Sequence, residues 1–135
     1  MDSATLLNVN VDAGANLVRE LDARQISPET AAWIYFSDRD QWRLLLQFDV
    51  AGEKHATLVE IARILGTRDD IAQGISMGQV AVVGPDDDLA ASIKSVVHTG
   101  AGVSNMPIGP SYALGNYIEK GLIYRARDRP LQALN

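Results

Sequence analysis

The segment AAWIYFSDRDQWRLLLQF, from Ala31 to Phe48, decides the fold because it holds both tryptophans and both phenylalanines of the chain. Aromatic and branched residues lie on both sides of the polar stretch DRDQ, and this arrangement is typical of a β-hairpin. We expect a four-residue loop from Asp38 to Gln41, which pairs Trp33 with Leu46 across the two strands.

The two faces of this hairpin differ sharply in polarity. Side chains alternate across a strand, so residues two apart share a face. A shift of the register by one residue would mix the two sets and destroy the strongly apolar face. We therefore expect that face to lie in the core, and its residues are Trp33, Tyr35, Trp42, Leu44, Leu46 and Phe48.

The opposite face of the hairpin is too apolar for bare contact with water and too polar for a dry interior. It carries Ile34, Phe36 and Leu45, interrupted by Arg43 and Gln47. A semi-apolar patch of this kind suits a protein interface. Two alternatives remain open here: one of the helices covers the face, or another molecule binds to it. The candidate binding residues are Ile34, Phe36, Arg43 and Leu45.

Hydrophobic spacing and glycine punctuation predict the elements around the hairpin. Their order, helix, hairpin, helix, strand, helix, strand, indicates a single α+β domain over residues 1–135. We expect a mixed sheet of four or five strands with the helices packed mainly on one face. The segments are an edge strand or extended lead-in over Thr5–Val11, helices over Asp12–Arg24 and Glu53–Leu65, a strand over Gln79–Gly84, a helix opened by Asp86-Asp87-Asp88 and closed by Gly100, a long loop over 100–116, and a final strand over Tyr117–Arg127.

Charge and composition narrow the classes of partner. The net charge of −5 repels phosphate backbones, so a nucleic-acid partner is not expected. The chain has no cysteine, which rules out thiol catalysis and cysteine-ligated metals. No segment approaches the ~18 apolar residues of a membrane span, and no secretory signal is evident. We therefore expect a cytoplasmic protein that does not enter the membrane.

A competing interpretation centres on one histidine. His98 ends a predicted helix, beside the glycine-rich loop and a strand that carries Glu119, Tyr124 and Arg125. If these four side chains gather beneath the loop, they form an acid–base site of a small hydrolase or nuclease-like toxin. Neither a metal-ligand motif nor a P-loop is present, so no metal or cofactor is expected.

Three motifs together carry a family resemblance. The hairpin segment, the stretch VVGPDDDLAASI and the stretch GNYIEKGLIYR resemble corresponding segments of a family of small uncharacterised bacterial proteins. The resemblance spans about three quarters of the chain and implies the fold, but it implies no activity. The leading expectation is a non-enzymatic protein that acts through protein–protein interaction, as a homodimer formed through the second hairpin face. A small-ligand-binding module, with the 100–116 loop as a lid, is the third alternative.

Overall fold

The structure is a computed structural model that describes residues 5–49 and 54–127. Five strands form a mixed sheet in the order β3-β2-β1-β7-β4, and β5 and β6 form a separate two-stranded sheet. The helices are α1 (Asn8–Ala23), α2 (Lys54–Thr67), α3 (Asp69–Ala72) and α4 (Asp88–Val96), with one 3₁₀ turn, η1 (Met77–Gln79). The strands are β1 (Thr30–Phe36), β2 (Gln41–Gln47), β3 (Val80–Val83), β4 (Met106–Ile108), β5 (Ser111–Ala113), β6 (Asn116–Ile118) and β7 (Gly121–Ala126).

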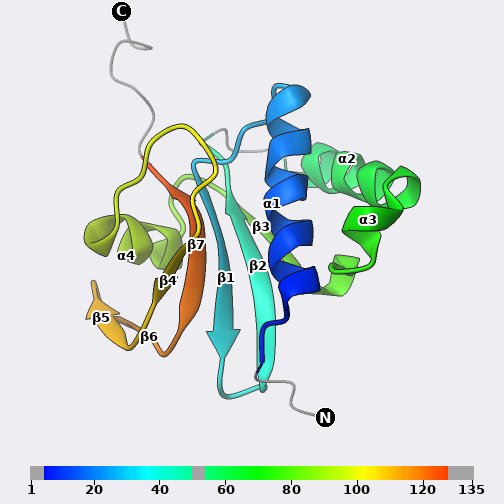
Figure 1. Ribbon diagram of the computed structural model, residues 1–135. Helices are drawn as coiled ribbons and strands as arrows, with labels where there is room; N and C mark the ends of the chain where they lie inside the picture. The colour runs from blue at the N-terminus through cyan, green and yellow to red at the C-terminus, as the bar shows by residue number, and fades with distance from the viewer. Residues whose placement is uncertain (1–4, 50–53, 128–135) are drawn as a thin grey trace, which may run out of the picture.

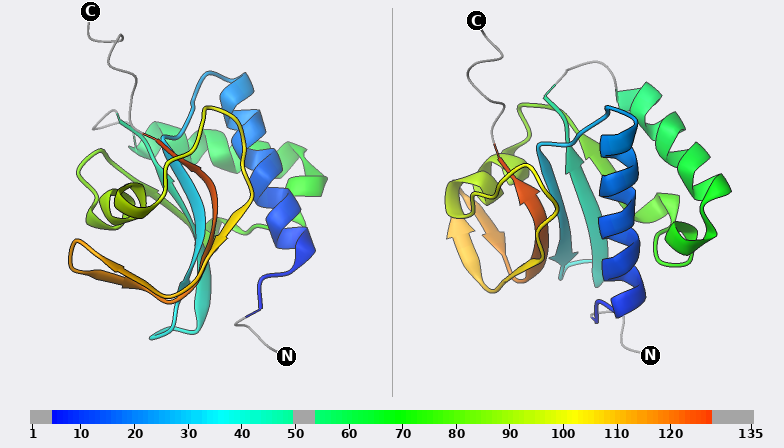
Figure 2. Two further views of the ribbon diagram at one scale, coloured as in Figure 1. Left: turned by 60° about the vertical axis from the view of Figure 1, so that its left-hand side comes forward. Right: turned by 45° about the horizontal axis from the view of Figure 1, so that its top comes forward.

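The helices lie on both faces of the sheet but unequally. Helices α1, α2 and α3 cover one face, whereas α4 and the small β5–β6 hairpin lie on the other (Figures 1 and 2). All strand pairs are antiparallel except β2 and β3, which run parallel and are joined by α2 and α3. Parallel neighbours need such a crossover connection. The α+β class, the mixed five-stranded sheet and the uneven distribution of helices are therefore confirmed.

The hairpin of β1 and β2 has the expected faces but a different register. Trp33 pairs with Leu44 rather than Leu46, because the loop runs from residue 37 to residue 40. Asp40 closes this loop in a left-handed conformation (φ 49°), and its carboxylate accepts a hydrogen bond of 2.7 Å from the Tyr35 hydroxyl. A displacement by two residues returns every side chain to its own face. The prediction of the faces is thus correct although the predicted pairing is wrong.

The first helix begins four residues earlier than predicted. Residues 8–11 are helical and form neither an edge strand nor an extended lead-in. The cause is Asn10, whose side-chain oxygen accepts a hydrogen bond of 2.9 Å from the backbone N–H of Leu7. Its amide also donates to the carbonyl of Gly74, 2.9 Å away, and so ties this helix end to the segment after α3. Asp12 therefore lies inside the helix.

The C-terminal third contains more strands than predicted. The expected loop over 100–116 includes β4 and β5, and the expected single strand over Tyr117–Arg127 is divided into β6 and β7. Gly121 begins β7 where a Cβ would lie 2.9 Å from the carbonyl oxygen of Trp33. A close approach of another backbone is a typical reason for a glycine within a strand.

The remaining predicted elements are present with small shifts at their ends. The strand predicted over Gln79–Gly84 is β3, and the last predicted helix is α4, which ends at Val96 rather than near Gly100. The Asp87 carboxylate accepts a hydrogen bond from the backbone N–H of Ala90 at 3.0 Å, so the acidic run caps the helix as expected. The predicted start of α2 at Glu53 lies outside the described residues.

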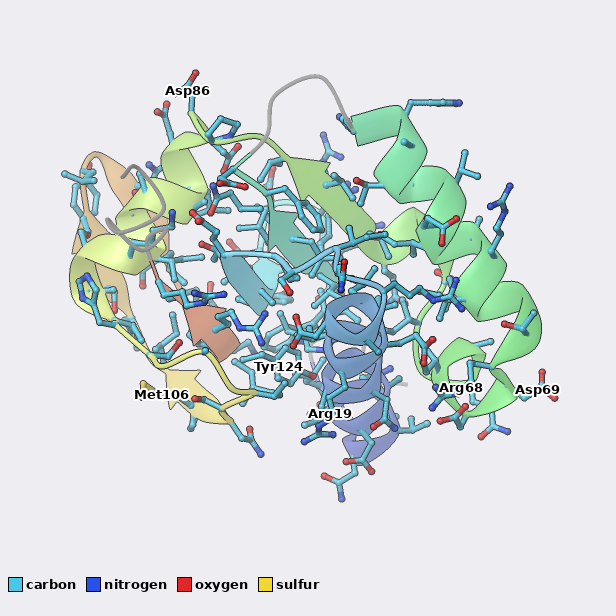
Figure 3. All side chains as sticks on the ribbon, turned by 90° about the horizontal axis from the view of Figure 1, so that it is seen from above. Arg19, Arg68, Asp69, Asp86, Met106 and Tyr124 are labelled. Atoms are coloured by element: carbon cyan, nitrogen blue, oxygen red, sulfur yellow. The ribbon has the colours of Figure 1, made fainter. Side chains whose placement is uncertain are left out.

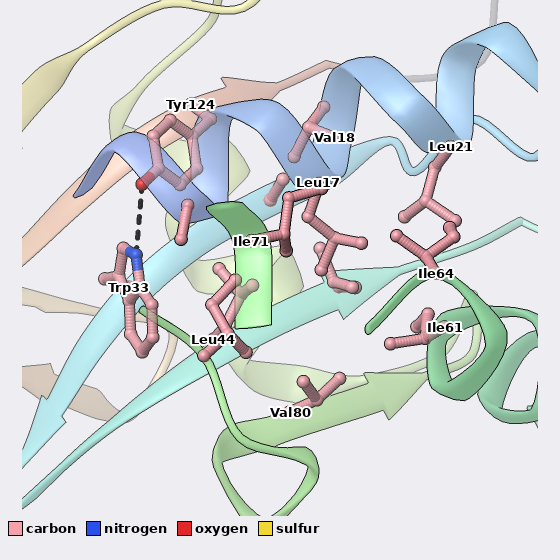
Figure 4. Packing of buried hydrophobic residues seen from close by; sticks show 14 of the residues in the cluster. Leu17, Val18, Leu21, Trp33, Leu44, Ile61, Ile64, Ile71, Val80 and Tyr124 are labelled. Atoms are coloured by element: carbon pink, nitrogen blue, oxygen red, sulfur yellow. Dashed lines mark hydrogen bonds between the residues drawn. The ribbon is translucent and has the colours of Figure 1, made fainter. Parts of the chain in front are cut away.

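The core consists of two layers, one on each side of the sheet. The larger layer lies under α1, α2 and α3 and includes Leu46. Trp33 and Leu44 belong to the same layer (Figure 4). Here the Trp33 Nε1–H donates to the Tyr124 hydroxyl at 3.0 Å, and that hydroxyl donates to the Val11 carbonyl at 2.6 Å. The smaller layer lies between the sheet and α4. Both apolar faces of the sheet are thus used in folding.

Candidate functional site

Helix α4 covers much of the β1–β2 hairpin face that was predicted from the sequence to be a binding surface. Ile34 is 2% exposed and Leu45 is 4% exposed, and both pack in one cluster with Ile93 of α4. Phe36 and Arg43 are half-buried near the loop end of the same face. Of the two alternatives that the sequence leaves open, cover by a helix therefore holds for Ile34 and Leu45, which belong to a second core layer.

The proposed acid–base residues do not converge on one site. Tyr124 and Arg125 both face α1, because β7 carries a β-bulge at Tyr124, the extra residue between the partners of Ala31 and Ala32. His98 follows α4, which packs on the opposite face of the sheet, and it is exposed. Glu119 lies in the turn before β7 and is half-buried. His98 is thus exposed after α4, whereas the Tyr124 hydroxyl is buried against α1.

Tyr124 is fully buried and lies between α1 and the sheet, whereas Asp86 and Met106 lie at the periphery (Figure 3). Burial raises the pKa of the Tyr124 phenol well above its ordinary value of 10, although the hydrogen bond from Trp33 acts in the opposite direction. The phenol therefore stays protonated and donates to the α1 backbone. Its role is to hold the helix to the sheet.

Arg125 connects four segments of the chain and is 1% exposed. Its guanidinium makes a bidentate pair with the Asp22 carboxylate of α1, at 3.0 and 2.7 Å. It also donates to the carbonyls of Pro28 and Ala101, at 3.1 and 2.6 Å. Arg125 does lie beneath the start of the glycine-rich loop, as predicted, but its donors are used to fix that loop.

The salt bridge with Arg125 also affects the acidity of Asp22. Burial acts to raise the pKa of this carboxyl, but the hydrogen bonds from Arg125 and Ser27 and the nearby arginine charges outweigh it. The pKa of Asp22 is therefore lowered below its ordinary value of 3.8. This ion pair stabilises the junction of α1, β7 and the loop, and it offers no acid or base for catalysis.

The β5–β6 hairpin carries the three most exposed large hydrophobic side chains among the residues that the structure describes. Its register pairs Tyr112 with Tyr117 on the outer face, where they are 73% and 59% exposed. Leu114, at the tip, is 69% exposed. We call these three residues the aromatic hairpin face. This hairpin is not predicted above because Leu-Gly is not a standard turn pair. The alternation in SYALGNYI is the signal that the sequence offers for it.

Inward-facing residues fix this hairpin to the body of the protein. Ile118 is 2% exposed and belongs to the core layer under α4. The Asn116 amide donates to the Ser92 hydroxyl of α4 at 2.8 Å. The inner face of the β5–β6 hairpin is therefore packed against the protein, and its outer, apolar face is exposed to solvent.

Comparison with protein-family models, curated proteins and solved structures finds no match for this chain. The resemblance to a bacterial family thus stays a prediction. Within the described ranges, no helix combines the length and apolar character needed to cross a bilayer. The same residues contain no cluster of three or more histidine, aspartate or glutamate side chains suited to hold a metal ion.

Proposed function

We propose that this is a non-enzymatic protein that acts through protein–protein contact and self-associates through the aromatic hairpin face. The observation that carries the proposal is the exposure of Tyr112, Leu114 and Tyr117 on one small, well-anchored element. The outer face of an antiparallel sheet is normally polar when it borders water. Tyrosine is also enriched at interfaces, because its ring buries a large apolar area and its hydroxyl remains available for hydrogen bonding.

The backbone at the hairpin tip supports a binding role. Leu114 has φ 49° and Gly115 has φ 83°, so both residues of the two-residue loop are left-handed, as a type I′ turn requires. Asparagine is the favoured residue at the first of these positions, whereas a left-handed leucine costs about 1–2 kcal/mol. An exposed leucine held at this cost is explained if its side chain is buried against a partner.

A second copy of the chain is the occupant we infer. The aromatic hairpin face carries no charge, whereas the chain as a whole carries −5, so this is a patch on which two copies meet without direct like-charge contact. In a two-fold dimer the same patch supplies both sides of the contact. Side chains of this size present roughly 350 Å² together, well below the ~800 Å² per partner of a standard interface. The dimer is therefore expected to be weak and reversible.

Sedimentation velocity over a wide concentration range tests this proposal. The wild-type mass should rise from monomer toward dimer, and Tyr112→Thr combined with Tyr117→Thr should remain monomeric, since threonine keeps the β-propensity without the ring. Val59→Ser is the matched control, because Val59 is an exposed apolar residue of α2, 38% accessible, outside the patch. A wild-type chain that stays monomeric throughout would contradict self-association, as would an equal loss in the control.

Leu114→Asn separates the interface from general stability. Relief of the left-handed leucine should raise the free energy of unfolding of the monomer by about 1 kcal/mol, while loss of the tip side chain weakens the dimer. Opposite signs in the two measurements are the signature of a residue retained for contact. If both quantities fall together, the role assigned to Leu114 is wrong.

A further inference from the structure

A cavity of about 600 Å³ lies beside the ends of the two parallel strands. Phe48 and Asp49 enter it directly after β2, and residues 84–87 enter it directly after β3. Ligands of sheets with parallel strands bind outside the carboxyl ends of those strands, where the connecting loops diverge. The volume also falls within the ~300–1,000 Å³ of small-molecule sites.

One wall of this cavity is apolar. Val82 is 4% exposed and belongs to the core layer under α1 and α2, and Ile26 and Phe48 pack against that same layer. An apolar wall continuous with the core favours a ligand with a hydrocarbon or aromatic body. Thr57 lines the cavity on the α2 side and is a polar residue.

The charged residues around the cavity favour a ligand of one sign of charge. Among the described residues, three carboxylates line it, those of Asp49, Asp86 and Asp87, together with one ammonium group, that of Lys54. A helix N-terminus attracts anions, but at α4 the Asp87 carboxylate already occupies the first-turn N–H of Ala90. Among the described lining residues the aspartates outnumber the lysine, so the net charge of the lining is negative, which disfavours an anionic ligand and favours a cation.

We propose that this cavity binds a small organic amine, with its apolar body against Val82 and Phe48 and its ammonium group among the aspartates. The site shares no lining residue with the aromatic hairpin face. A bare metal ion is a poorer fit, because the apolar wall offers it no ligand and a hydrocarbon body uses that wall fully.

Isothermal titration with phenethylamine and 3-phenylpropionate tests the proposal, since these probes share a phenyl body and carry opposite charges. Phenethylamine should bind the full-length protein, more weakly as ionic strength rises, and the carboxylate probe should not bind measurably. Tighter binding of the carboxylate would overturn the proposal, and so would equal binding of the two probes or binding of neither.

Three variants locate the binding. Combined Asp49→Asn and Asp86→Asn should weaken phenethylamine about tenfold. A control with the same change of charge elsewhere, combined Asp38→Asn and Asp69→Asn at exposed positions, should leave the affinity unchanged. Gly84→Trp adds a large ring at a lining position where a Cβ meets no atom within 4 Å, so the variant should fold and lose binding. An equal loss in the charge control, or full binding by the folded Gly84→Trp variant, would refute the assigned site.

Discussion

Replacement of Gly14 by alanine tests the contact between α1 and the sheet. In the helix interior, alanine is normally favoured over glycine by about 1 kcal/mol. At this position, however, a Cβ would collide with the Tyr124 hydroxyl and lie 2.8 Å from Trp33 Nε1. Neither atom can move freely, because the hydroxyl is hydrogen-bonded on one side to Trp33 and on the other to the Val11 carbonyl. Helix α1 must therefore shift away from β7.

The expected cost follows from these contacts. Overpacking in a close-packed core costs about 1–3 kcal/mol, and each hydrogen bond lost by the Tyr124 hydroxyl costs about 1 kcal/mol. The gain in helix propensity offsets about 1 kcal/mol. Gly14→Ala should therefore lower the free energy of unfolding by about 2–4 kcal/mol, measured by urea denaturation followed by circular dichroism.

A double-mutant cycle shows whether the collision is the cause. Tyr124→Phe alone should cost about 1–2 kcal/mol, but in the Gly14→Ala background it should cost almost nothing, because those hydrogen bonds are already broken. Gly66→Ala is the control, since a Cβ in this part of α2 meets no atom within 4 Å and the change should be neutral or slightly stabilising. Additive losses in the double variant would refute the reasoning.

Three further predictions concern the interior. The lowered pKa of Asp22 means that its ion pair stabilises the fold at pH values above the ordinary carboxyl range, and that this contribution is lost as the pH falls through the folded pKa. The Asp22→Asn variant should therefore be less stable at pH 7, and its free energy of unfolding should change less between pH 6 and pH 3 in urea titrations. Parallel curves for the variant and the wild type would contradict this. The raised pKa of Tyr124 predicts that wild-type stability declines as the pH rises past ~10, where the unfolded phenol ionises, whereas Tyr124→Phe gives a flatter curve between pH 8 and 11. Leu45→Ala should cost about 2–4 kcal/mol as a core truncation and leave the oligomeric mass of the folded protein unchanged, which a mass shift without loss of stability would disprove.

The sequence was sufficient to predict which side chains share each face of the β1–β2 hairpin. A register shifted by an even number of residues leaves every side chain on the same face. The pairing itself depends on the loop, where the left-handed Asp40 and its hydrogen bond from Tyr35 select residues 37–40. No local pattern distinguishes this loop from one displaced by a single residue, since DRDQ and SDRD are both polar.

The covered second face and the placement of Arg125 depend on tertiary structure. Strict alternation predicts that Tyr124 and Arg125 face opposite sides of the sheet, but the bulge turns both toward α1. Arg125 faces α1 because its guanidinium pairs with the Asp22 carboxylate of that helix. The pairing joins residues far apart in the sequence, so it can be seen only in the folded structure. Whether a helix or a partner covers Ile34 was likewise a question of packing, which the semi-apolar pattern leaves open.

The place of β7 in the sheet has a consequence for synthesis on the ribosome. This strand is the last of the described chain to emerge, yet it lies between β1 and β4 rather than at an edge. Until β7 is synthesised, the edge of β1 opposite β2 has no strand to pair with, and Asp22 lacks the guanidinium of Arg125. Nascent chains stalled before residue 121 should therefore be protease-sensitive and should engage chaperones, and protection should appear abruptly once β7 clears the exit tunnel.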